Sequence, residues 1–304
     1  MNNATLLILA AGMGSRYQGQ KQIEAVGSKG ECIMEFTIFD ALKLGIRKFV
    51  LIVNTQFPIE FKNKLIEISE KQHFEIHFIT QTIDKFIPKS YLNKLDKRIK
   101  PLGTAHAVYC AKDLIDEPFI TVNADDYYGN NSLEMAMQLL HNKQIDSNNF
   151  GIVAFMLQNT LSENGPVSRG ICRIQNHQLK DVEEFSNILK VGSSITGVQT
   201  NRITEILNAT DYVSMNLWVL HPSFFKFAEQ DLETFLKQSD LSNKEFYLPN
   251  VIDSAIKKQT LKVWAKLSSE KWVGLTYKAD KSMVVDTIAQ KRLQNFYPKY
   301  LWEK

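Results

Sequence analysis

The 304-residue sequence has few cysteines and no long apolar run. Its three cysteines, Cys32, Cys110 and Cys172, form no CxxC pair, which excludes a zinc ribbon and a thioredoxin-like redox motif. We therefore expect them to be small core residues of a protein in a reducing, cytoplasmic compartment. No stretch approaches the roughly 18 apolar residues of a membrane span, so we expect no membrane partner.

The sequence also lacks an excess of charge of one sign. Its 36 basic and 33 acidic residues give a formal net charge of +3, too small to indicate nucleic acid as the main partner. The six histidines form no HExxH or clustered pattern, so we expect structural or surface roles for them. With 44% hydrophobic and 23% charged residues, the composition is that of an ordinary globular protein.

Short apolar runs alternate with helical patterns along the first half of the chain. Strands are expected at 6–9, 49–53, 74–80, 119–122, 151–157, 170–174, 179–184, 212–220, 261–265 and 272–277. Helices are expected at 33–44, 61–69, 105–114, 133–141, 231–237 and 248–257. This order predicts an α/β fold with a layered, mixed, mainly parallel sheet and a Rossmann-like N-terminal half. We expect a single domain over 1–304, with halves at about 1–150 and 151–290, and a solvated basic insertion at 82–101.

The most informative segment is the turn after the first strand, LAAGMGSRY at 9–17, with Lys21 soon after it. A Rossmann dinucleotide motif is disfavoured because Tyr17 occupies the position of its third glycine. A Walker P-loop is excluded because the GxxxxGK[ST] pattern is absent. A purely structural turn remains possible, but it has no need of Arg16 and Lys21.

The residue types in this turn suit a polyphosphate. Gly12 and Gly14, next to Ala11, allow backbone N–H groups to approach phosphate oxygens closely. Arg16 can donate to two phosphate oxygens at once, and Lys21 adds a compact positive charge. The turn is therefore interpreted as a loop that binds a nucleoside triphosphate.

Acidic residues follow a second buried strand. Asp125 and Asp126 come directly after the predicted strand 119–122, and the carboxyl ends of such strands form the ligand edge of a sheet. Carboxylate oxygens suit Mg²⁺, which usually also bridges to phosphates. We expect Asp125 to be the metal ligand and Asp126 to cap the next turn.

The segment 9–16 with Lys21-Gln22 resembles the signature of the sugar-phosphate nucleotidyltransferases, the NDP-sugar pyrophosphorylases, whose fold is similar to that of GT-A glycosyltransferases. The resemblance implies a Mg²⁺-dependent enzyme that transfers NMP from an NTP to a sugar 1-phosphate and releases pyrophosphate. It implies that Arg16 stabilises the departing pyrophosphate, that Lys21 contacts phosphate during transfer, and that Asp125 binds the metal.

Later segments resemble further motifs of this family in the same order. By resemblance, Gly103, Thr104 and Gln81 bind the nucleotide at its base. Glu183 in Glu183-Glu184-Phe185 corresponds to the sugar-contacting glutamate, although the lysine of the family's Glu-Lys-Pro is missing, and Asn216 is expected in the acceptor pocket. Gly274 stands where many members have a second metal-binding aspartate, so Asp280 is the candidate to supply that carboxylate.

Two alternatives remain open at the level of sequence. The missing lysine is compatible with a cytidylyltransferase acting on a phosphoalcohol such as phosphocholine. The missing aspartate is compatible with a non-catalytic nucleotide-binding regulatory subunit. All three hypotheses have small-molecule partners, and the sequence predicts neither the base nor the oligomeric state.

Overall fold

The computed structural model describes residues 4–14, 17, 19–199 and 202–302. The strands are β1 (Thr5–Ala10), β2 (Lys48–Val53), β3 (Glu75–Thr80), β4 (Phe119–Asn123), β5 (Asp126–Tyr127), β6 (Asn149–Met156), β7 (Val167–Gln175), β8 (Gln178–Val191), β9 (Ser194–Gln199), β10 (Thr204–Leu207), β11 (Tyr212–Leu220), β12 (Lys262–Ser268) and β13 (Val273–Gly274). The α-helices are α1 (Ile33–Lys43), α2 (Ile59–Gln72), α3 (Thr104–Tyr109), α4 (Asn130–His141), α5 (Phe224–Leu236), α6 (Leu248–Lys257) and α7 (Lys281–Leu293).

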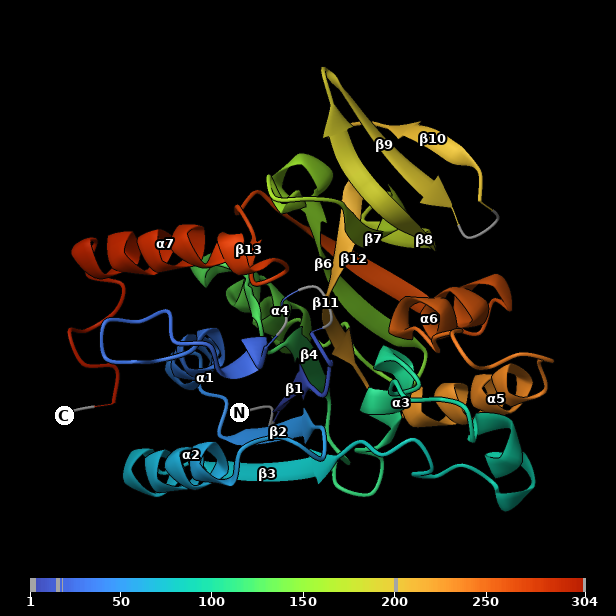
Figure 1. Ribbon diagram of the computed structural model, residues 1–304, viewed down its shortest axis with the longest axis horizontal. Helices are drawn as coiled ribbons and strands as arrows, with labels where there is room; N and C mark the ends of the chain where they lie inside the picture. Colours follow the sequence, from blue (N-terminus) through green and yellow to red (C-terminus); the bar gives the residue numbers. More distant parts are fainter. Residues whose placement is uncertain (1–3, 15–16, 18, 200–201, 303–304) are drawn as a thin grey trace.

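Strand β1 lies in the parallel part of the main sheet, between β2 and β4, and β3 extends this part beyond β2. Every residue of β1 is buried because helices cover both faces. Leu6 and Ile8 pack with α1, α2 and α4, whereas Leu7 and Leu9 pack with α3, α5 and α6. Figure 1 shows α1 and α2 on one side of the sheet and α3, α5 and α6 on the other. The α/β fold class is confirmed.

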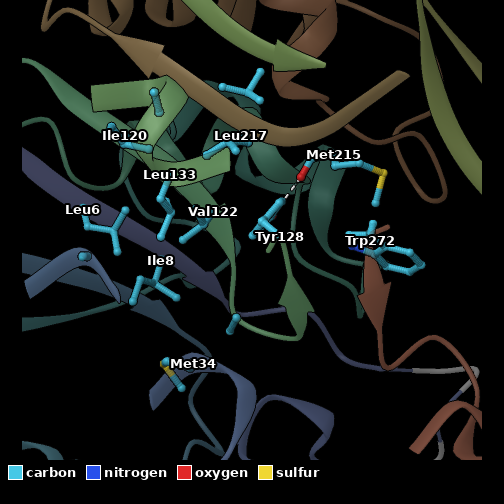
Figure 2. Packing of buried hydrophobic residues seen from close by; sticks show 14 of the residues in the cluster. Leu6, Ile8, Met34, Ile120, Val122, Tyr128, Leu133, Met215, Leu217 and Trp272 are labelled. Atoms are coloured by element: carbon cyan, nitrogen blue, oxygen red, sulfur yellow. Dashed lines mark hydrogen bonds between the residues drawn. The ribbon is translucent and has the colours of Figure 1, made fainter. Parts of the chain in front are cut away.

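One of the two core layers is seen from close by in Figure 2. Leu6 and Val122 come from neighbouring strands, and Leu133 of α4 belongs to the same buried cluster. The Tyr128 hydroxyl donates a hydrogen bond of 2.8 Å to the carbonyl of Met215. This bond ties the segment after β4, which contains Asp125 and Asp126, to β11.

The sheet is mixed, as expected, but the expectation that it is mainly parallel is not confirmed, because antiparallel pairs outnumber parallel pairs among the described strands. In the described part of the chain, β11 pairs antiparallel with β4, β6 and β7, while β12 pairs in parallel with β6. Only two residues, Asn176 and His177, connect β7 to β8, and both have positive φ. A connection this short permits only an antiparallel pair.

Strands β8, β9 and β10 form an antiparallel ribbon that extends away from the helices, at the top of Figure 1. Strand β8 runs well past the predicted segment 179–184, and neither β9 nor β10 was expected. The side chain of Ile206 in the edge strand β10 is 76% exposed.

The insertion 82–101 is not simply a solvated segment, because a buried arginine attaches it to the rest of the protein. Arg98 is 5% exposed. Its guanidinium donates to the carbonyls of Lys100 and Pro101 within the insertion, and to those of Leu241 and Lys244 in the loop before α6. The insertion and the 241–247 loop are therefore fixed together.

The C-terminal segment forms a third hydrophobic cluster. The expected strand 272–277 is reduced to the two residues of β13, and α7 follows it instead. Tyr17 from the glycine turn is buried in this cluster with Val284 and Ile288 of α7 and with Tyr297. The bulky residue at the third glycine position therefore packs the turn against the C-terminal helix.

The three cysteines are buried and free, as expected. No helix within the described ranges has both the length and the apolar character needed to cross a bilayer.

Candidate functional site

A cleft of about 390 Å³ opens at the carboxyl ends of β1 and β4, beside the first turn of α3. The N-terminal half lines it with residues of the glycine turn, of α3 and of the acidic segment after β4, and the other half with residues of β7, β8, β11 and the loop before α6. Among the residues expected at the site, those that line the cleft are Ala11, Gly12, Gly14, Lys21, Gln81, Gly103, Thr104, Asp125 and Asn216. Segments far apart in the sequence thus meet at the edge where ligands bind in open α/β sheets.

The glycine turn has a backbone conformation that suits close approach to a ligand. Gly14 has φ +56, and a Cβ there would lie 3.0 Å from the carbonyl oxygen of Gly19. The Gln22 side chain donates a hydrogen bond to the carbonyl of Gly12 and so supports the turn from behind. Arg16, the other expected catalytic residue, lies outside the described residues.

Lys21 and Asp125 form an ion pair between their Nζ and Oδ2 atoms. The two side chains are 20% and 13% exposed, so water screens their attraction only in part. The pair joins the glycine turn to the acidic segment, which are 104 residues apart in the chain. Without a ligand, the charges of Lys21 and Asp125 neutralise each other. A phosphate bound here would lie next to both side chains.

Asp126 lies beside Asp125 and is buried, at 5% exposed. Burial and then the charge of Asp125 raise the pKa of Asp126 to about 7. The Asn123 side chain donates to Asp126 Oδ2 at 2.7 Å, which favours the ionised form. A divalent cation would favour that form further, because it compensates both negative charges.

Two neighbouring carboxylates that line the cleft are a donor set that fits Mg²⁺, which takes one or two carboxylates and leaves its other positions to water and phosphate. No group of three or more histidine, cysteine or acidic side chains within the described ranges is placed to bind a metal. The residues present therefore fit a cation held jointly with substrate, not one enclosed by protein ligands alone.

One end of the cleft is built around Gly103. This residue has φ +119, and a Cβ on it would lie 2.6 Å from the carbonyl oxygen of Phe246. Only glycine permits this approach. Gln81 Nε2 donates to the Gly103 carbonyl at 3.2 Å, and the Thr104 hydroxyl accepts a 2.9 Å bond from the N–H of Leu248. Gln81 and Gly103 are thus brought together despite the insertion between them.

The structure corrects the choice between the two adjacent glutamates of β8. Glu184 lines the cleft, whereas Glu183 accepts a bond of 3.3 Å from Gln199 and faces a separate hollow beside β10. Successive side chains of a strand point to opposite faces, so the assignment was wrong by one residue. Burial is the main cause that raises the pKa of Glu184 to about 7, and Arg169 opposes the shift.

Asn216 lies in the cleft, at a strand irregularity. Its φ is +60, within the register shift of β11 between Ser214 and Trp218. Its Nδ2 donates to Asn123 Oδ1 at 3.1 Å. Asn123 also bonds to Asp126, so these side chains connect β11 to the acidic segment.

Asp280 does not line the cleft, and its carboxylate is fully used elsewhere. It is 2% exposed and accepts hydrogen bonds from the backbone N–H groups of Thr276 and Tyr277 and from the side chains of Ser162 and Asn164. This carboxylate caps the turn that leads into α7. We therefore withdraw Asp280 from the expected metal ligands.

Several cleft residues were not expected from the sequence. These residues are Asn123, Arg169, Glu184, Glu245, Tyr247 and Trp272. The Arg169 guanidinium lies 4.7 Å from the centre of the Trp272 ring and donates to the carbonyl of Thr160 at 2.6 Å. Strand alternation could have identified Glu184, whereas Glu245 and Tyr247 belong to a loop without any recognisable pattern.

Comparison with known proteins places the chain in a known family. A family model described as nucleotidyl transferase matches residues 5–272. A structure from Bacillus anthracis named as a glucose-1-phosphate thymidylyltransferase in complex with a sucrose has a TM-score of 0.63, with 12% identity over 93% of this chain and 95% of that chain. The inositol-1-phosphate CTP transferase from T. maritima has a TM-score of 0.60, with 13% identity over 95% of this chain and 96% of that chain. No curated protein matches the sequence. By its match to the family model, the chain belongs to the nucleotidyl transferase family.

Proposed function

We propose that the chain transfers a nucleoside monophosphate from an NTP to a sugar 1-phosphate and releases pyrophosphate. The observation that supports this best is the meeting of Lys21 and Asp125 beside the glycine turn, in a cleft that Glu184 and Asn216 also line. The names of both structural neighbours describe transfer to a phosphorylated sugar or cyclitol, which agrees with a polar acceptor half.

In this reaction an oxygen of the acceptor phosphate attacks the α-phosphorus of the NTP, and the bond to the pyrophosphate oxygen breaks. The nucleophile is already an anion, so no protein base is needed, and catalysis depends on positioning and on compensation of charge. The amides of Gly12 and Gly14 are proposed to hold the triphosphate, and Arg16 the leaving pyrophosphate. When the substrates bind, Lys21 leaves Asp125 and contacts the phosphate that is transferred.

Asp125 and Asp126 are the residues that would hold Mg²⁺. The cation would supply neutralisation of phosphate charge beside the α-phosphorus. Gln81, Gly103 and Thr104 would bind the nucleotide at its base, and Glu184 and Asn216 the hydroxyl groups of the acceptor.

The test is a pyrophosphate-release panel in which each NTP is combined with several sugar 1-phosphates, inositol 1-phosphate and phosphocholine, with and without Mg²⁺. We expect release with one NTP and a sugar phosphate. Release with phosphocholine alone would support the cytidylyltransferase alternative, and nucleotide binding without release under any pairing would support a regulatory subunit.

Lys21→Ala and Asp125→Asn test the site within the same panel. Each should lower kcat by about 100-fold or more, the usual effect of removing one transition-state contact. Lys190→Ala, on the exposed face of the β8 ribbon, is the matched control and should turn over normally. Near-normal activity of either cleft variant would contradict the assignment.

A further inference from the structure

His106 is buried directly behind the nucleotide end of the cleft and does not line it. It is 0% exposed, and its place in α3, three residues after Gly103 and one turn along the helix, turns its side chain to the same side as Gly103. Its two ring nitrogens contact different segments. Nδ1 lies 3.1 Å from Gln81 Nε2, and Nε2 lies 2.8 Å from the carbonyl oxygen of Lys85.

These two contacts determine which nitrogen of His106 bears the proton. A backbone carbonyl can only accept, so Nε2 must donate to Lys85. Burial lowers the pKa of His106 to about 4, so the ring is neutral at physiological pH and Nδ1 is left as an acceptor. The only group of Gln81 that can donate to Nδ1 is its NH₂, and the same nitrogen also donates to the Gly103 carbonyl at 3.2 Å.

Both hydrogens of the Gln81 amide are therefore used inside the protein. Its remaining polar atom, Oε1, is the one available to the cleft that Gln81 lines. Turning the amide over would place Oε1 against the lone pair of His106 Nδ1 and against the Gly103 carbonyl oxygen. That arrangement replaces two hydrogen bonds by two repulsive contacts between acceptors.

We propose that His106 is a positioning residue that holds the Gln81 amide with its oxygen toward the nucleotide, so that the cleft favours the base whose N–H donor lies where it can reach this oxygen. The ligand class is a nucleoside triphosphate whose base donates from a ring N–H or an exocyclic amine to Gln81 Oε1. This inference rests on the proposed function, because it assigns the base-binding end of the same cleft.

Two amide side chains of different length, asparagine and glutamine, can each replace only one of the two contacts of His106. In His106→Asn, the side-chain oxygen can take the place of Nδ1 and accept from Gln81. In His106→Gln, the longer side chain reaches toward the Lys85 carbonyl instead, and Gln81 loses its acceptor. We expect His106→Gln to raise KM for the preferred NTP by about tenfold, the value of one hydrogen bond, with the effect on KM and not on kcat. His106→Asn should restore most of the affinity.

A double-mutant cycle with Gln81→Ala distinguishes positioning from a merely structural role. If His106 acts through Gln81, His106→Gln adds no further increase in KM once Gln81 is alanine, and it loses its effect on discrimination between NTPs. Equal increases in KM in the two backgrounds, or unchanged discrimination in His106→Gln, would overturn the proposal. Thermal unfolding of each variant shows whether it is folded.

A measurement on the unmodified protein adds a test that needs no variant and no turnover. ¹⁵N NMR of the histidine-labelled protein should show His106 neutral, with hydrogen on Nε2 and a bare Nδ1. Hydrogen on Nδ1 would overturn the inference. Failure of the proposed function is a different result, since it is the absence of pyrophosphate release by the wild-type protein with every NTP.

Discussion

Gly274 lies opposite Asp126 in the two-stranded ribbon of β5 and β13, so close that a Cβ on Gly274 would come within 2.6 Å of Asp126 Oδ1 and 2.4 Å of the Trp272 ring. The space that a side chain at 274 would need is therefore already filled by Asp126 and Trp272. Asp125 and Asp126 together form the acidic edge of the cleft. The second carboxylate of this edge thus comes from β5 and not from the C-terminal segment.

Gly274→Ala should displace Asp126 and Trp272 together. We expect the free energy of unfolding to fall by about 1–3 kcal/mol, as for other overpacked sites, and kcat to fall because the acidic edge is disturbed. Denaturant unfolding and pyrophosphate release measure the two effects. Gly19→Ala, where the nearest atom to a Cβ is 3.7 Å away, is the control for stability. Wild-type stability and activity of Gly274→Ala would show that the close contact is unimportant.

Glu184→Gln and Glu183→Gln form a matched pair on adjacent positions of β8. Only Glu184 lines the cleft, so its substitution should raise KM for the acceptor by about tenfold or more, as expected for a lost hydrogen bond to a charged group. Glu183→Gln should leave acceptor KM nearly unchanged. Steady-state kinetics with the acceptor varied at saturating NTP decides between them, and the reverse ranking would restore the assignment made from the sequence.

Arg98→Ala should weaken the attachment of the insertion to the loop that contains Glu245 and Tyr247. The substitution leaves four backbone carbonyls without their donor, so we expect a loss of at least about 3 kcal/mol in the free energy of unfolding. Arg173→Ala is the control, because the Arg173 side chain is 70% exposed. A loss in Arg98→Ala no larger than in this control would argue against the role of the buried arginine.

Asp40 should make the protein less stable as the pH rises. Burial raises the pKa of Asp40 from 3.8 to about 6, although Tyr297 donates a bond to it. The folded state thus binds the proton more tightly than the unfolded chain. The resulting stability is fully present below pH 3.8 and is lost as the pH rises through about 6.

Asp40→Asn removes this titration, so the difference in unfolding free energy between wild type and variant should decline by on the order of 2 kcal/mol between pH 4 and pH 7. Chemical denaturation at several pH values measures it. Asp286→Asn, on the exposed side of α7, is the control for replacing a carboxylate by an amide. A constant difference for Asp40→Asn would contradict the raised pKa.

The parts of the site that could be predicted from sequence are those encoded within a few neighbouring residues. The glycine turn and the acidic segment each follow a short buried strand, and parallel strands bring their ends to one edge, so the meeting of Lys21 and Asp125 follows from local pattern and fold class. Gly103 was also recognisable, because its motif is contiguous.

The parts that could not be predicted depend on contacts between distant segments. The choice of Glu184 over Glu183 requires the register of β8, which its long pairing with β7 and β9 sets. Asp280 has the right chemistry for a metal, but its position in a tight turn directs its carboxylate to backbone N–H groups. The large share of antiparallel pairs follows from two-residue connections such as Asn176-His177, and the length of the strands that they join is not encoded in the local pattern.

The burial of Tyr17 among residues of α7 has a consequence for how the enzyme should fail on warming. The turn proposed to hold the triphosphate shares a hydrophobic cluster with a C-terminal helix that contributes only Val284 and Ile288 as buried residues. A helix with so few buried residues unfolds at a lower temperature than a sheet that helices cover on both faces. Turnover should therefore vanish at a lower temperature than the circular dichroism of the strands.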